Sequence, residues 1–164
     1  MNDIVEQAPN IPQKTGFSGA EYNAVATQAK LEAINLLDSR FEVNAECLNE
    51  SENWTLSYGR KVISCTVDSD DGYVAAILRY EVTAKLGRKR AMLCRADYGI
   101  YYSIPKDSKQ EAAVGFCRNV GSYAAYPYFR ALVAQLTWNA GINLPPLPAI
   151  SSTAHIPKKA PKVS

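Results

Sequence analysis

Histidine is almost absent from this sequence of 164 residues. The only one, His155, lies among Ser, Pro and Lys near the C-terminal end. A Ser-His-Asp or Cys-His catalytic system needs an imidazole held rigidly beside its nucleophile, and that segment offers no such support. The four cysteines, Cys47, Cys65, Cys94 and Cys117, form no CxxC pair, which favours reduced thiols over a zinc site or a disulfide framework. We therefore expect no enzyme, and neither a metal nor another cofactor.

Long hydrophobic runs and an excess of one charge are lacking too. No apolar run approaches the roughly 18 to 20 residues of a membrane span, and the first residues lack the basic start and apolar core of a signal peptide. We expect a cytoplasmic protein without membrane insertion. Lys and Arg number 18 against 16 Asp and Glu, a net charge of +2, which is far from the basic footprint of a nucleic-acid-binding protein.

The chain has the length of one globular domain. Residues 1–17 contain Pro and Gly without any period and are predicted to form a flexible arm. A single domain is expected over residues 18–150. Residues 151–164 carry three lysines and no acid, and their Pro content and lack of period predict a disordered basic tail.

The expected domain begins with a short helix. Ser18 and Glu21 fit the capping box, in which the serine hydroxyl and the glutamate carboxylate accept from each other's backbone amides. Residues 22–33 are rich in Ala, Gln and Lys, and we expect about three helical turns there.

The middle of the chain changes to a period of two. Alternation is clearest where Leu78, Tyr80 and Val82 share one face. Gly72 and Gly87 mark hairpin turns. A four-stranded antiparallel sheet with one apolar face is therefore predicted, with strands over residues 34–43, 55–67, 73–86 and 91–104.

Helical spacing returns after the sheet. Residues 107–120 place Ala112, Ala113, Phe116, Cys117 and Val120 on one face, and Gly121-Ser122 interrupts the pattern. Residues 123–140 form a second, longer helix with an apolar stripe, which Gly141 ends. The predicted fold class is α+β: a four-stranded antiparallel sheet with long C-terminal helical segments and a short N-terminal helix.

Several segments resemble SecB, the bacterial export chaperone, in the same order and at the same spacing. These are residues 78–87, 91–94 and 102–104, the run Tyr126-Pro127-Tyr128-Phe129-Arg130, and the proline motif Asn143-Leu144-Pro145-Pro146-Leu147. Asp38, Phe41 and Glu42 resemble the family's first strand, and Trp54 stands where SecB carries a tryptophan. The resemblance covers about residues 34–150.

The resemblance implies an ATP-independent chaperone that binds and holds unfolded or nascent polypeptides in apolar grooves for protein export. It also implies a homotetramer built as a dimer of dimers. The residues expected to line the client-binding groove are Trp54, Leu56, Tyr58, Leu78, Tyr80, Val82 and Tyr102. Those expected at the oligomer interface are Tyr126, Phe129, Leu132, Val133 and Leu136.

Three departures from SecB bear on the partner. No helical pattern follows the proline motif. Asp38, Leu93 and Arg95 are the residues expected at a partner-docking site. Arg95 is basic, whereas the family carries at this position the acid that contacts the SecA motor, and this argues against SecA as partner. The N-terminal helix resembles SecB-like chaperones of toxin–antitoxin pairs. One alternative is thus a chaperone dedicated to one partner such as an antitoxin; another is a small-molecule-binding or enzymatic α+β domain with a deep, closed pocket.

Overall fold

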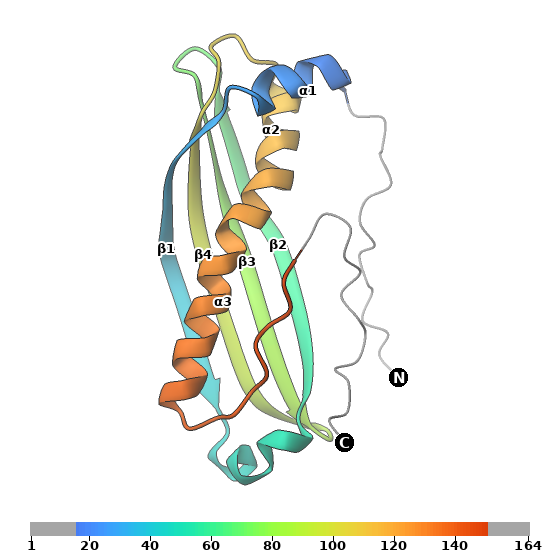
Figure 1. The fold of residues 1–164 in the computed structure, drawn as a ribbon, viewed down its shortest axis with the longest axis vertical. Coiled ribbons are helices and arrows are strands. Elements are labelled where there is room, and N and C mark those ends of the chain that lie inside the picture. Colours follow the sequence, from blue (N-terminus) through green and yellow to red (C-terminus); the bar gives the residue numbers. More distant parts are fainter. Residues whose placement is uncertain (1–15, 151–164) are drawn as a thin grey trace.

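Four long antiparallel strands carry a single layer of helices on one face (Figure 1). The computed structural model describes residues 16–150. The predicted arm, except for Gly16 and Phe17, and the predicted basic tail lie outside the described residues. Within residues 16–150, no helix is long and apolar enough to cross a membrane.

The predicted strands are confirmed. They are β1 (Lys30–Val43), β2 (Thr55–Asp68), β3 (Tyr73–Leu86) and β4 (Lys89–Ser103), in the spatial order β1-β4-β3-β2. Two hairpins join β2 to β3 and β3 to β4, and η1 (Ala45–Asn53) makes the crossover from β1 to β2. Gly72 has a φ of +74°, and a Cβ there would lie 2.8 Å from the carbonyl oxygen of Ile104, so this turn requires glycine.

The N-terminal helix α1 (Gly19–Ala26) begins at the predicted capping box. The Glu21 amide donates to Ser18 Oγ at 3.2 Å, and the Ser18 amide donates to the Glu21 carboxylate. The expected length of three turns was wrong, because the chain is already extended at Lys30, which pairs with Ser103 of β4. Long-range sheet pairing overrides the local helical propensity of residues 30–33.

The second helical zone is one continuous run. It consists of α2 (Gln110–Phe116), the π-helix η2 (Cys117–Gly121) and α3 (Ser122–Asn139). The predicted interruption at Gly121 was therefore wrong. A π-helix adds a residue to the turn and rotates the residues that follow. As a result, Gly121 faces the core, whereas Val120, predicted to face it, is 37% exposed.

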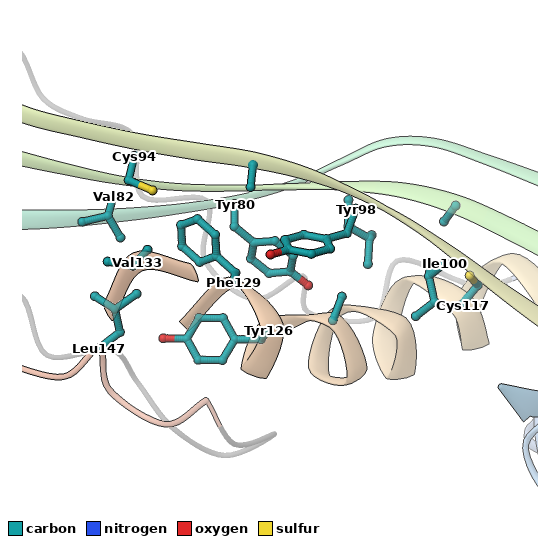
Figure 2. Packing of buried hydrophobic residues seen from close by; sticks show 14 of the residues in the cluster. Tyr80, Val82, Cys94, Tyr98, Ile100, Cys117, Tyr126, Phe129, Val133 and Leu147 are labelled. Carbon is teal, nitrogen blue, oxygen red and sulfur yellow. The ribbon is translucent and has the colours of Figure 1, made fainter. Parts of the chain in front are cut away.

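The helical run and the sheet meet in an aromatic cluster. The rings of Tyr80 and Phe129 stack with centroids 5.4 Å apart, and both side chains are almost fully buried. Tyr98 and Tyr126 pack against the Tyr80 ring at 6.1 and 5.9 Å (Figure 2). The Tyr80 hydroxyl donates a 2.6 Å hydrogen bond to the carbonyl oxygen of Ser122. This cluster fixes where α3 crosses the sheet.

Replacing Phe129 by alanine should therefore lower the free energy of unfolding by about 3–5 kcal/mol, because the cavity would lie between helix and sheet. Tyr128→Ala on the same helix is the control, since Tyr128 is exposed and its loss should cost less than about 1 kcal/mol. Urea unfolding followed by circular dichroism measures both. Equal losses for the two variants would contradict the role of Phe129 in anchoring α3.

Candidate functional site

After α3 the chain turns back alongside the helix. Gly141, with a φ of +69°, ends the helix, and the Ile142 amide donates to the carbonyl oxygen of Thr137 at 2.9 Å. We call residues 141–150 the strap. It lies beside α3 on the side of β2 (Figure 1). Up to Ile150 the strap contains no helix; the predicted absence of a second helix over residues 149–157 falls almost wholly outside the described residues.

Two contacts fasten the strap to the domain. Leu147 is only 3% exposed and packs into the core beside Val133 (Figure 2). The Tyr126 hydroxyl donates to the carbonyl oxygen of Pro148 at 2.6 Å. A hydrogen bond thus holds the strap near the start of α3, and apolar packing holds it farther along the helix, beside Val133.

An apolar groove of about 570 Å³ runs between α3 and the strap. One wall is the helix and the other is the strap, and Trp138, 83% exposed, stands at its edge. The lining residues are mostly aliphatic, aromatic or proline: Tyr123, Tyr126, Pro127, Arg130, Ala131, Val133, Ala134, Thr137, Trp138, Ile142, Asn143, Leu144, Pro145, Pro146, Leu147, Ala149 and Ile150.

Two hydroxyl groups of the groove are committed to the fold. The Thr137 hydroxyl donates to the carbonyl oxygen of Val133 at 2.8 Å, and the Tyr126 hydroxyl bonds to the strap. Burial raises the pKa of Tyr126, which keeps the phenol protonated. Arg130 is the one charged residue of the lining. What this arrangement offers a ligand is apolar surface with an aromatic edge.

Strand β2 borders the same region. The guanidinium of Arg60 lies 5.5 Å from the centre of the Tyr123 ring, a cation–π contact. Tyr58 and Leu56, which the sequence placed in a client-binding groove, face the helical layer and remain partly exposed. Burial raises the pKa of Tyr58. Their role in binding stays a prediction.

The other predicted groove residues lie in the core. Leu78, Tyr80 and Val82 on β3 are at most 1% exposed, because the helical run covers the two central strands. Tyr102 is 4% exposed and packs edge-on against Phe116 at 5.0 Å. In this arrangement a bound chain reaches none of these four side chains, so their expected place in the groove needs correction.

Trp54 is buried as well, at the end of η1. Its indole Nε1 donates to the carbonyl oxygen of Cys47 at 3.1 Å, so the side chain closes the crossover. The exposed tryptophan is Trp138, which the sequence interpretation missed. Its signal was available: position 138 falls outside the apolar stripe of its helix, where a large aromatic side chain has no place in the core.

The predicted oligomer-interface residues divide into two groups. Tyr126, Phe129 and Val133 are buried within the chain's own fold, whereas Leu132 and Leu136 are partly exposed on α3. The flank of the helical run opposite the strap carries further apolar side chains. We call the following set the bare flank: Val120, Ala124, Tyr128 and Leu132 of the helical run, with Leu31 and Leu36 of β1.

The predicted docking residues come together on the face of the sheet without helices. Asp38 pairs in register with Asp97, and Arg95 with Glu81, while Leu93 is buried. Between them Arg79 donates two 2.7 Å hydrogen bonds to the Asp97 carboxylate. This ion pair lowers the pKa of Asp97. Acidic and basic side chains thus lie side by side on this face, with Arg79 and Arg95 next to Asp97 and Glu81.

Comparison with solved structures gives the fold. The chain is similar to the SecB-like chaperone Rv1957 of Mycobacterium tuberculosis, solved in complex with a ChAD peptide from the Rv1956 HigA1 antitoxin. The two share 14% identity with a TM-score of 0.71, over 82% of this chain and 99% of the other. A protein of unknown function from Streptococcus agalactiae matches at 9% identity over 76% of this chain and 97% of its own, with a TM-score of only 0.35.

No protein-family model and no curated protein matches the sequence. The structural likeness nevertheless shows that this chain has the fold of a SecB-like chaperone. The resemblance to SecB predicted from the sequence is therefore confirmed for the fold, including the four-stranded sheet, the long C-terminal helix and the short N-terminal helix.

The Arg79–Asp97 pair predicts a pH dependence of stability. Because the pKa of Asp97 is lowered in the folded protein, its contribution is present above the unfolded value of about 3.9 and is lost as pH falls through the folded value. The difference in unfolding free energy between wild type and Asp97→Asn should thus shrink below about pH 4. Urea titrations across this range measure it, with Asp70→Asn in an exposed turn as control; a constant difference would contradict the prediction.

Proposed function

We propose that this protein is a chaperone that holds non-native polypeptide segments in the groove between α3 and the strap. The observation that carries the proposal is the open apolar groove of about 570 Å³ with Trp138 exposed at its edge. Exposed large apolar side chains gathered around a groove are typical of protein interaction sites. The fold of a SecB-like chaperone supports the proposal.

Holding an unfolded segment in this groove needs no ATP. Burying a large apolar side chain of the client contributes about 1.5–3 kcal/mol. Two or three such side chains contribute about 3–9 kcal/mol before the entropic cost of association is subtracted, so a short segment binds weakly and reversibly to one groove. In this proposal the groove holds a segment without a catalytic step, and the Tyr126 and Thr137 hydroxyls of its lining are bonded to the backbone.

The client is a second question. The similar Mycobacterium tuberculosis structure holds an antitoxin peptide, and this favours, as second candidate, a chaperone dedicated to one partner. Export through the SecA motor is less well supported, since the basic Arg95 stands where SecB carries an acid and Arg79 pairs with the neighbouring Asp97. Cytoplasmic location belongs to the same proposal.

We further propose that copies of the chain associate through the bare flank, as the predicted homotetramer requires. Leu31 and Leu36 are each 47% exposed and Tyr128 is 54% exposed. These side chains lie on or beside β1, an edge strand of 14 residues. Within residues 16–150, no strand pairs with the backbone groups on the outer side of β1. An edge of this length invites pairing with another chain, and several grooves in one assembly would raise the affinity for a long client.

The client-holding proposal is tested with an extended, tryptophan-free peptide rich in Leu, Ile and Val. Its binding should shift the emission of Trp138 to shorter wavelength, because the exposed indole becomes buried. Trp138→Ala should weaken binding roughly tenfold, in line with the loss of about 1.5 kcal/mol of apolar contact. Calorimetric titration without ATP measures the affinity.

Tyr101→Ala is the matched control, since Tyr101 is an exposed aromatic residue on the opposite face of the sheet. It should leave the affinity unchanged. The full chain should also suppress aggregation of a denatured enzyme without ATP, and Trp138→Ala should require a higher ratio for the same protection. Undiminished binding by Trp138→Ala would exclude this groove as the binding site.

The assembly proposal predicts that Leu36→Lys shifts the protein to a smaller species, because a charge in an apolar interface is costly to bury. Light scattering coupled to size-exclusion chromatography measures the mass. Tyr101→Lys, which adds the same charge on the other face of the sheet, should keep the wild-type mass. A wild-type monomer at micromolar concentration would contradict self-association.

A further inference from the structure

The charged residues are distributed unevenly along the chain. All 16 Asp and Glu residues stand at or before Glu111, whereas residues 112–150 contain Arg118 and Arg130 and no acid. Residues 112–150 make up nearly the whole helical run and the strap. Both walls of the groove are therefore built from a part of the chain whose charged side chains are all positive.

Arg130 brings one of these charges into the groove. Its side chain belongs to the groove lining and is exposed. Within residues 16–150 it has no ion-pair partner. Burial raises the pKa of Tyr126, and the charge of Arg130 opposes this rise, which shows that the charge acts inside the groove. The guanidinium is available to an anion that enters there.

A second guanidinium lies at the same end of the groove. Arg60 faces the helical layer from β2 and lies 5.5 Å from the centre of the Tyr123 ring, which lines the groove. Among the described residues Arg60 has no ion-pair partner either. Tyr123 and Arg130 belong to the first half of α3, whereas Trp138 stands near its end. The groove thus has a cationic end and an aromatic end.

No acidic side chain offsets these charges within the groove. None of the lining residues is Asp or Glu. The crossover η1 carries Glu46, Glu50 and Glu52, and it lies at the end of the sheet where α3 ends (Figure 1). The negative charges are therefore nearer to the aromatic end than to the cationic end. A bound segment meets a favourable site for a carboxylate only toward the start of α3.

We propose that the groove selects apolar segments that also carry an Asp or Glu carboxylate, which pairs with Arg130 while the apolar side chains pack against Trp138 and the strap. The inference rests on the proposed client holding and names its substrate class. A segment with Lys or Arg in the same place is disfavoured, because its charge would lie beside two unpaired guanidiniums.

The geometry of α3 sets the spacing of these features in the client. Arg130 and Trp138 are eight residues apart, which is about 12 Å along an α-helix. An extended chain covers this distance in about four residues. The preferred client therefore places its carboxylate about four residues from the apolar side chain that contacts Trp138.

The test uses the full chain and three peptides with the same apolar sequence. They carry Glu, Gln or Lys at both positions four residues from a central Leu, so that either chain direction is served. Calorimetric titration at low salt should rank the affinities Glu, Gln, Lys, with about threefold between successive peptides. At about 1 M salt the differences should nearly vanish, because charges are then screened within about 3 Å.

Each other outcome has a distinct meaning. Equal affinities at low salt, or tighter binding of the Lys peptide, would overturn the selectivity and leave client holding intact. Absence of binding by all three peptides would contradict client holding itself, and the selectivity would fall with it.

Two variants of Arg130 check its role. Arg130→Glu should reverse the ranking, so that the Lys peptide binds most tightly, and Arg130→Gln should bind the Glu and Gln peptides equally. Arg88→Glu is the matched control, because Arg88 is an exposed residue of the turn between β3 and β4. It changes the net charge as Arg130→Glu does and should keep the wild-type ranking. An unchanged ranking in Arg130→Glu would overturn the assignment of Arg130.

Discussion

The structure depends on one mismatch of widths. An α-helix with its side chains is about 10 Å across. A sheet of four strands spaced about 4.8 Å apart is roughly twice as wide as the helix. One helical run therefore covers the two central strands and leaves the outer two uncovered. The burial of the inner face follows this division: Tyr80 of β3 and Ile100 of β4 are at most 1% exposed, while the inward side chains of β1 and β2 remain partly exposed. The stack of Phe129 on Tyr80 decides where the covered zone lies.

The two uncovered flanks are treated differently. On the side of β2 the strap returns over the sheet and is fastened by Leu147 and by the bond from Tyr126 to Pro148. A strap without a helix is narrow, so it cannot fill the space against α3, and the groove with Trp138 at its edge is what remains. On the side of β1 nothing in residues 16–150 covers Leu31, Leu36 or Tyr128. The chain thus exposes two apolar flanks, and in the proposed assembly the flank with the regular edge strand takes the second copy.

The sequence predicted the sheet, both hairpin turns and the helix cap because these features depend on local chemistry: alternation along the strands, glycine at Gly72 and Gly87, and the Ser18–Glu21 pair. The site could be predicted less well. Which apolar side chains of a strand stay accessible depends on the width and path of the layer above them, so Leu56 and Leu78 have similar patterns and different exposures. Trp54 shows the same limit, because its indole closes the η1 crossover through a hydrogen bond to the carbonyl oxygen of Cys47 that no sequence pattern indicates.

The extra residue of the π-helix accounts for several of these differences together. With regular α-helical turns, the spacing of Ala113, Phe116 and Cys117 would have continued to Val120 and then to Ala124 on the buried side. The inserted residue moves the buried positions to Gly121 and Ala125 instead, and it turns Val120 outward. The bare flank and the buried stripe of α3 are therefore set by the same five residues. Gly121 lies against the sheet, where a Cβ would be in van der Waals contact with Ile100 and the sulfur of Cys117 at 3.5–3.7 Å.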